Sequence, residues 1–126
     1  MTLPRDGAAI DRRVLDGFRE SGSGDAPDAF VNQLIDLYLV ESVSLSTAVA
    51  EAIARNDAPA LARAAHSLRG SAGAIGATRV AELSAELETL ARGGGVDGSA
   101  ALLAALEDES THVRRELLLE RRITAN

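Results

Sequence analysis

The sequence predicts an all-α protein, an antiparallel four-helix bundle with a short accessory helix at its N-terminal side. Alanine and leucine dominate the composition, and aromatic residues make up only 2% of the chain. Alanine and leucine favour helices, whereas the scarce aromatic and β-branched residues favour strands. Apolar residues also recur at helical spacing in long segments separated by glycine, serine or proline. A length of 126 residues suits one domain with a modest core.

Periodicity and chain breaks predict five helices in order. They cover about residues 8–20, 27–55, 58–75, 79–92 and 99–122. The breaks are Ser21–Gly24, Asn56 with Asp57, Gly76, and Gly93–Gly95. Asp57 is placed to cap the third helix, and Gly76 can take the left-handed conformation common just past a helix end. Four long amphipathic helices with short connections pack most simply as an antiparallel bundle, with the first helix capping one end.

The second predicted helix has an unusually broad apolar face. Its members are Phe30, Leu34, Leu37, Tyr38, Leu45, Val49 and Ile53. Between Leu37 and Leu45 apolar residues occur nearly all round the helix. We therefore expect the first helix to pack on the back of that stretch.

Charge and composition exclude several classes of function. The net charge of −6 disfavours nucleic-acid binding, which needs a basic surface to displace counterions. The chain has no cysteine, so it has neither disulfides nor a thiolate metal site. We find no stretch approaching the roughly 20 apolar residues that cross a bilayer, and no apolar run typical of a signal peptide near Pro4. We expect no membrane association and a cytoplasmic protein.

The third predicted helix displays a histidine on its outer face. Its apolar stripe consists of Leu61, Ala65, Leu68, Ala72 and Ile75. At about 100° per residue, His66 projects roughly 150° away from the centre of that stripe. Its outer-face neighbours are Ala62, Arg63, Gly70 and Gly73. The sequence thus predicts an exposed imidazole on a nearly side-chain-free surface, accessible to another protein.

Glu88 is the best candidate to orient this imidazole. Neutral imidazole is a usable nucleophile at neutral pH, and attack by one nitrogen is favoured when an acceptor holds the other N–H. A helical hairpin turning at Gly76 brings His66 and Glu88 near each other, and Glu88 lies at the edge of the fourth helix's apolar stripe. Alternatively, Glu88 pairs only with Arg92, four residues further along its own helix.

Arg69 and the glycines next to the histidine carry further predictions. Arg69, one turn beyond His66, can stabilise transferred phosphate charge, with Arg63 a weaker candidate. The alternative for Arg69 is a solvated charge or an ion pair with an acidic neighbour. Each glycine inside a helix costs about 1 kcal/mol relative to alanine. We interpret Gly70 and Gly73 as leaving room for a partner, with close helix packing as the alternative.

These residues resemble the histidine-containing phosphotransfer (HPt) domains of bacterial phosphorelays. The resemblance rests on His66-x-x-Arg69-Gly70-Ser71-x-Gly73-x-x-Gly76-Ala77, followed by Leu83, Leu87 and Glu88. It covers about residues 27–122 in layout, and its specific part spans about residues 57–92. It implies that His66 is the phosphoacceptor, that Arg69 holds the family's Lys/Arg position, that Gly70 is its small residue and that Glu88 orients the ring.

The resemblance also implies the partners. It predicts a phosphocarrier rather than a kinase, exchanging phosphate with response-regulator receiver domains, and it leaves open whether a hybrid sensor kinase is involved. The chain needs no cofactor of its own, because the Mg²⁺ that supports transfer belongs to the receiver. We expect a monomer. The glycines at 70, 73 and 76 match neither a P-loop nor a dinucleotide fingerprint.

Two rival functions remain at this stage. One is a binding-only helical module that docks a receiver or a kinase without accepting phosphate. The other is a metal or haem bundle, which two isolated histidines support poorly. We interpret the second histidine, His112, as an exposed helix residue.

Overall fold

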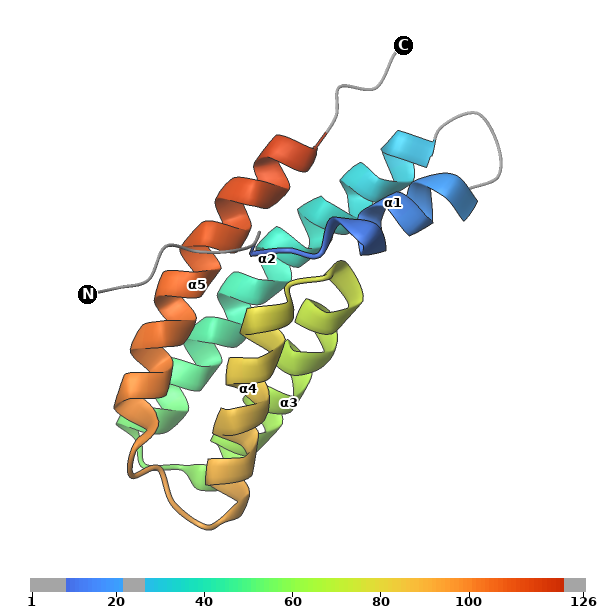
Figure 1. Ribbon diagram of the computed structural model, residues 1–126. Helices are drawn as coiled ribbons and strands as arrows, with labels where there is room; N and C mark the ends of the chain where they lie inside the picture. The colour runs from blue at the N-terminus through green and yellow to red at the C-terminus, as the bar shows by residue number, and fades with distance from the viewer. Residues whose placement is uncertain (1–8, 22–26, 122–126) are drawn as a thin grey trace, which may run out of the picture.

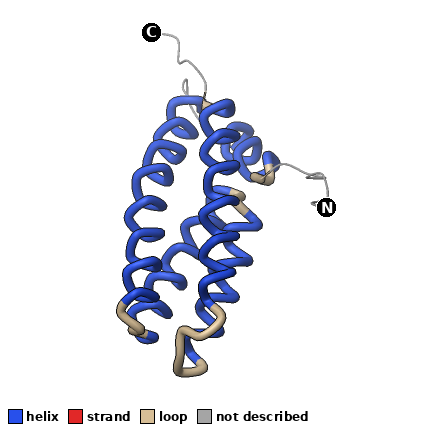
Figure 2. Tube along the Cα trace, turned by 90° about the vertical axis from the view of Figure 1, so that its left-hand side faces the viewer, coloured by secondary structure: helices blue, strands red, loops and turns tan. Residues whose placement is uncertain are grey.

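The computed structural model describes residues 9–21 and 27–121, and these form helices without any strand (Figure 1, Figure 2). The helices are α1 Arg12–Ser21, α2 Pro27–Ala54, α3 Ala58–Ile75, α4 Thr78–Arg92 and α5 Ser99–Glu120. In Figure 1, α2 to α5 alternate in direction and form the predicted antiparallel bundle, while α1 lies across one end. The predicted fold class is therefore confirmed.

The third helix has the bounds that its capping residues predicted. The Asp57 carboxylate accepts the backbone N–H of Ala60 at 3.1 Å, which satisfies one of the free donors of the first turn. At the other end Gly76 has a φ of 85°, in the left-handed region that favours glycine. A Cβ at Gly76 would lie 2.8 Å from the carbonyl oxygen of Asp11. Gly76 thus ends α3 and also admits the N-terminal segment.

The first helix starts later than predicted, at Arg12 instead of about residue 8. The backbone N–H groups of Ala9 and Ile10 donate to the carboxylate of Glu116 on α5 at 2.7 and 3.1 Å. Asp11 then caps the helix by accepting the backbone N–H two residues further on, at 3.1 Å. Ala9 and Ile10 therefore do not form a first helical turn, and their N–H groups bind a carboxylate that is distant in the sequence. Residue 8, the linker residues 22–26 and residue 122 lie outside the described residues.

The prediction of which α2 residues face inward is partly wrong. Tyr38 and Val49 are buried, but Phe30 is 47% exposed and Leu37 is 61% exposed. Helix α1 packs near the start of α2, where the rings of Phe18 and Phe30 meet edge to face with centroids 5.9 Å apart. With only 10 residues, α1 is about 15 Å long and does not cover the middle of α2. Leu37 and its apolar neighbours on α2 therefore stay exposed.

Helix α2 corrects one statement made from the sequence, that no stretch approaches the length of a membrane span. Its segment Asp28–Ala54 is long and apolar enough to cross a bilayer, by length and composition alone. One such helix is weak evidence, and α2 here packs against α3 and α5 as a member of the bundle.

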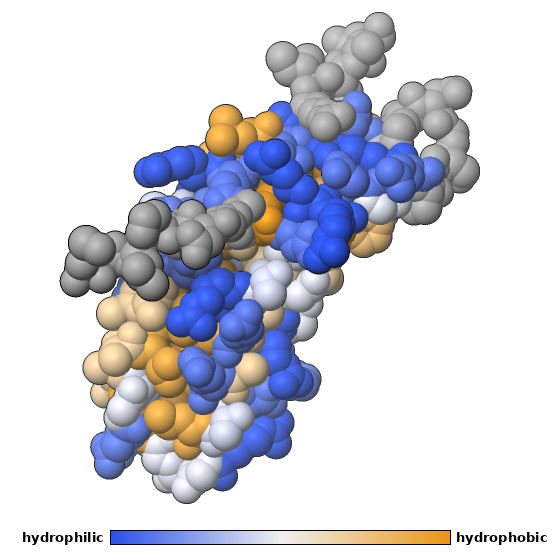
Figure 3. All heavy atoms as spheres, viewed as in Figure 1, coloured by the Kyte–Doolittle hydropathy of each residue, from blue (hydrophilic) through white to orange (hydrophobic). Residues whose placement is uncertain are grey.

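The core lies between the four long helices. All five residues of the predicted α3 stripe are buried, with Leu61, Ala65, Leu68 and Ala72 fully enclosed and Ile75 4% exposed. They face α4, with which α3 shares its most extensive contact. Figure 3 shows that the face of the molecule seen in Figure 1 is mainly polar, with an apolar area over the lower part of α5 and its junction with α4. Because this stripe is buried, the opposite face of α3 lies towards solvent.

Candidate functional site

His66 lies on the outer face of α3, as the periodicity predicted. Its side chain is 59% exposed, while Leu68 and Ala65 on the opposite side of the helix are fully buried. The backbone under the imidazole is therefore fixed by the core, and the ring itself is open to solvent.

Glu88 of α4 binds the imidazole. Its side chain is only 7% exposed, and its Oε2 lies 3.0 Å from Nδ1 of His66. The same oxygen accepts Nε and Nη2 of Arg92 at 3.1 and 2.6 Å. The two sequence-based interpretations of Glu88, ring orientation and pairing with Arg92, thus describe one cluster.

The cluster fixes the ionisation of Glu88. The hydrogen bond from Arg92 lowers the pKa of the Glu88 carboxyl below its ordinary value of 4.5, burial opposes this, and His66 and Arg69 lower it further. At neutral pH Glu88 is therefore a carboxylate that only accepts hydrogen bonds. Consequently Nδ1 of His66 carries the proton that it donates, and in the neutral ring Nε2 is the nitrogen with a lone pair for attack.

Arg69 is brought to the same carboxylate. Its Nη1 lies 3.4 Å from Oε1 of Glu88, and its side chain is 45% exposed. Oε1 is buried and makes no hydrogen bond within the described part of the chain. Arg69 therefore forms an ion pair with the same acidic residue that holds His66. Its guanidinium is thus part of the cluster around the imidazole. Arg63 is exposed on the same side of α3.

The two glycines beside His66 are open to solvent. A Cβ built at Gly70 or at Gly73 would meet no atom within 4 Å. Close packing inside the chain thus does not require glycine at either position. Together with the half-exposed Ala62, they leave a surface of small residues around the imidazole.

Sequence reasoning missed a shallow hollow next to this surface. It has a volume of about 180 Å³ and is lined by α1, α2 and α3, with Phe18, Leu37, Ser71 and Ala74 among its lining residues. The Ser71 hydroxyl donates to Glu41 on α2 at 2.5 Å, which ties the two helices together there. The nearly all-round apolar pattern of α2 is the sequence signal for this exposed area, although we assign that pattern above to contact with the first helix.

The second histidine does not join the site. His112 is on α5, where its Nε2 lies 3.7 Å from Asp108, one turn earlier. Within residues 9–21 and 27–121, no three His, Cys, Asp or Glu side chains group closely enough to hold a metal ion.

Comparisons with known proteins agree with this arrangement. The family model of the Hpt domain matches residues 33–116. The crystal structure of histidine-containing phosphotransfer protein B (HptB) from Pseudomonas aeruginosa PAO1 superposes with a TM-score of 0.79 and 31% sequence identity, covering 90% of this chain and 94% of that one. No curated protein sequence matches the chain.

The matched region contains α3 and α4 in full, and with them His66, Arg69 and Glu88. The chain belongs to the Hpt domain family, the phosphotransfer domains of phosphorelays.

Proposed function

We propose that His66 accepts a phosphoryl group from the aspartyl phosphate of one receiver domain and passes it to the aspartate of another. The observation that carries this proposal is the pairing of an exposed imidazole with a buried carboxylate, Nδ1 to Oε2, at 3.0 Å. That pairing orients the ring and leaves Nε2 directed at an incoming partner.

The transfer step follows from this protonation state. Nε2 attacks the phosphorus atom, an N–P bond forms, and the P–O bond to the receiver's aspartate breaks to release a carboxylate. The ring keeps the proton on Nδ1 and becomes a phosphorylated imidazolium. Glu88 stabilises the positive charge of that ring, and in the return direction a second receiver's carboxylate attacks the same phosphorus.

Two arginines have different parts in the proposal. Arg92 makes the shorter contact with Glu88, at 2.6 Å, and keeps this carboxylate in place. Arg69 makes a longer contact of 3.4 Å and is nearly half exposed, so it is free to turn towards phosphoryl oxygens on His66. Glu88 then still has Arg92 as a partner.

The docking face is the surface of small residues around His66. It comprises Ala62, Arg63, Arg69, Gly70 and Gly73, and we extend it across Ala74 to the apolar hollow at Leu37. Exposed apolar area beside an open polar site is typical of protein interfaces. The receiver supplies the Mg²⁺ for transfer, and this domain acts as a cytoplasmic monomer without a cofactor of its own.

Phosphorylation of matched histidine variants tests the proposal. The protein is incubated with a phosphorylated receiver, and acid-labile, base-stable phosphate on the chain is quantified. We expect labelling of the wild type and of His112→Gln, which removes the other histidine, and none of His66→Gln. Persistent labelling of His66→Gln would contradict the proposal. A receiver that binds the wild type without transferring phosphate would instead support a binding-only module.

A further inference from the structure

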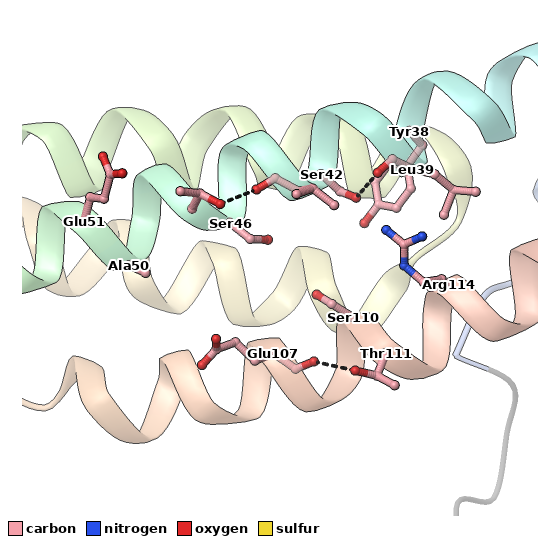
Figure 4. A pocket seen from close by; sticks show the side chains of 12 residues that line it. Tyr38, Leu39, Ser42, Ser46, Ala50, Glu51, Glu107, Ser110, Thr111 and Arg114 are labelled. Atoms are coloured by element: carbon pink, nitrogen blue, oxygen red, sulfur yellow. Dashed lines mark hydrogen bonds between the residues drawn. The ribbon is translucent and has the colours of Figure 1, made fainter.

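A groove lies between α2 and α5, away from His66. Its volume is about 480 Å³, within the range of small-molecule sites (Figure 4). Helices α2 and α5 form its walls, whereas His66 and its cluster belong to α3 and α4. The groove is therefore independent of the phosphotransfer site.

Small side chains keep this groove open. Ser42, Ser46 and Ala50 recur every four residues on α2, so they form one line along that helix facing α5. On the opposite wall α5 contributes Ser110 and Thr111. Bundle interfaces are usually filled by leucine-sized side chains, so the two helices here leave space between them.

Tyr38 directs an unused hydrogen-bond donor into that space. Its side chain is buried, with only 6% exposed, yet its hydroxyl has no hydrogen-bond partner among the described residues. Figure 4 shows the hydroxyl pointing into the groove, towards the end where Arg114 lies. Burial raises the pKa of Tyr38 to about 12, so the hydroxyl stays protonated in the physiological range. The hydroxyl therefore remains available in the groove as a donor to an acceptor on a ligand.

Further donors surround the same end. Arg114 lines the groove, and it makes no ion pair within the part of the chain that the structure describes. Ser110 lies one turn before it on α5, so both side chains face the same way. The hydroxyls of Ser42 and Thr111, in contrast, are bonded to carbonyls of their own helices at 3.5 and 3.2 Å. Three donors without a bond to the described residues, Tyr38, Ser110 and Arg114, thus line the same end of the groove, while the unbonded hydroxyl of Ser46 lies further along it.

The opposite end has the opposite charge. Glu51 and Glu107 line it, and Glu107 is two turns, about 10 Å, from Arg114 along α5. An anionic group is repelled there and attracted to the Arg114 end. Leu39, next to Tyr38 at the Arg114 end, and Val43, one turn further along α2, supply apolar wall.

We infer that the α2–α5 groove is a binding site for a small organic molecule that carries one carboxylate or phosphate group and a short apolar body. Its oxyanion accepts hydrogen bonds from Tyr38, Ser110 and Arg114, and its body lies against Leu39 and Val43. The guanidinium of Arg114 supplies positive charge at the rim of the groove. The hydroxyl of Tyr38 supplies a hydrogen bond that orients the oxyanion.

Binding of three related probes tests the site. The ¹⁵N-labelled full chain is titrated with phenyl phosphate, phenylacetate and the uncharged phenylacetamide, and amide chemical shifts are followed. We expect saturable shifts around Tyr38, Ser110 and Arg114 for at least one of the two anions, with a Kd on the order of 1 mM, and none for phenylacetamide. The better anion identifies whether the groove prefers phosphate or carboxylate.

Matched variants assign the binding to the groove. Arg114→Gln and Tyr38→Phe should each weaken binding by about tenfold, because each removes a hydrogen bond to a charged group. Arg115→Gln makes the same change of charge on the next residue of α5, which does not line the groove, and should leave the affinity unchanged. Circular dichroism of each variant confirms that the helices persist.

Three results of these titrations would overturn the inference, and the position of the shifts supplies a fourth. They are the absence of saturable shifts for both anions, equal binding of phenylacetamide, and equal weakening by Arg114→Gln and Arg115→Gln. Shifts confined to His66 and its neighbours would likewise place the anion at the phosphotransfer site instead of in the groove.

Discussion

The α3–α4 pair and the α2–α5 pair are built on opposite principles. Helices α3 and α4 share the most extensive contact of the bundle, and a buried carboxylate holds His66 across their junction. Helices α2 and α5 face each other through small hydroxylated residues, which leave a groove between them. This fold therefore places the group whose orientation matters on its most tightly packed helix pair, while the loosely packed pair retains space.

The largest effect is expected from breaking the core under the histidine. Leu68 is fully buried on the inner side of α3. Leu68→Ala should lower the free energy of unfolding by about 3 kcal/mol, as truncations of buried leucines do. Urea denaturation of this variant measures the change. Ser46→Ala in the α2–α5 groove is the matched control and should stay within about 0.5 kcal/mol of the wild type. Similar losses for the two variants would invalidate the contrast between the helix pairs.

The next largest effect concerns the orientation of the imidazole. Glu88→Gln keeps an acceptor for Nδ1 but removes the negative charge that the phosphorylated ring needs. The rate of transfer from a phosphorylated receiver should fall about ten- to a hundredfold, measured by rapid-quench phosphorylation. An unchanged rate would mean that Glu88 does not act on the ring.

The pH dependence of the same variant sharpens this prediction. Because the pKa of Glu88 is lowered in the folded protein, its ionised form stabilises the fold above pH 4.5. That contribution is lost as the pH falls through the lowered pKa. The stability difference between wild type and Glu88→Gln should therefore shrink in acid, and a constant difference would contradict the assigned shift.

A smaller effect separates docking from folding at Gly70. Gly70→Gln adds bulk only on the open side of α3, so transfer should slow by about tenfold. The helix itself should gain up to about 1 kcal/mol of stability, because glycine is a poor helix former. Gly70→Ala is the control: it should give a similar gain in stability with less effect on transfer. Thermal melts and transfer assays of both variants test this, and an unaffected rate in Gly70→Gln argues against the docking face.

The smallest effect is confined to high pH. Tyr38 is the only tyrosine of the chain, so its ionisation can be followed by absorbance without interference. We expect a midpoint near pH 12 in the folded protein, raised from 10.0 by burial. Since the neutral phenol is favoured by the fold, stability should be constant below pH 10.0 and fall as the pH rises towards 12. A midpoint near 10.0 would show that the phenol is solvated rather than buried.

The sequence by itself determined α3 and the outward direction of His66. Both depend on local geometry: the helical period sets the face of each residue, and Asp57 and Gly76 end the helix through contacts within a few residues. It also indicated Glu88 as a partner of the ring, since a short turn brings residues about equally far from it alongside each other.

Only the tertiary structure decided which apolar side of α2 is covered and how the N-terminal segment runs. Leu37 stays exposed because an unfilled hollow separates it from Phe18 of α1. Ala9 and Ile10 lie outside α1, where Glu116 accepts their N–H groups. The groove at Tyr38 likewise depends on the spacing of α2 and α5. Such features follow from distances between segments far apart in the chain, which a pattern of neighbouring residues does not encode.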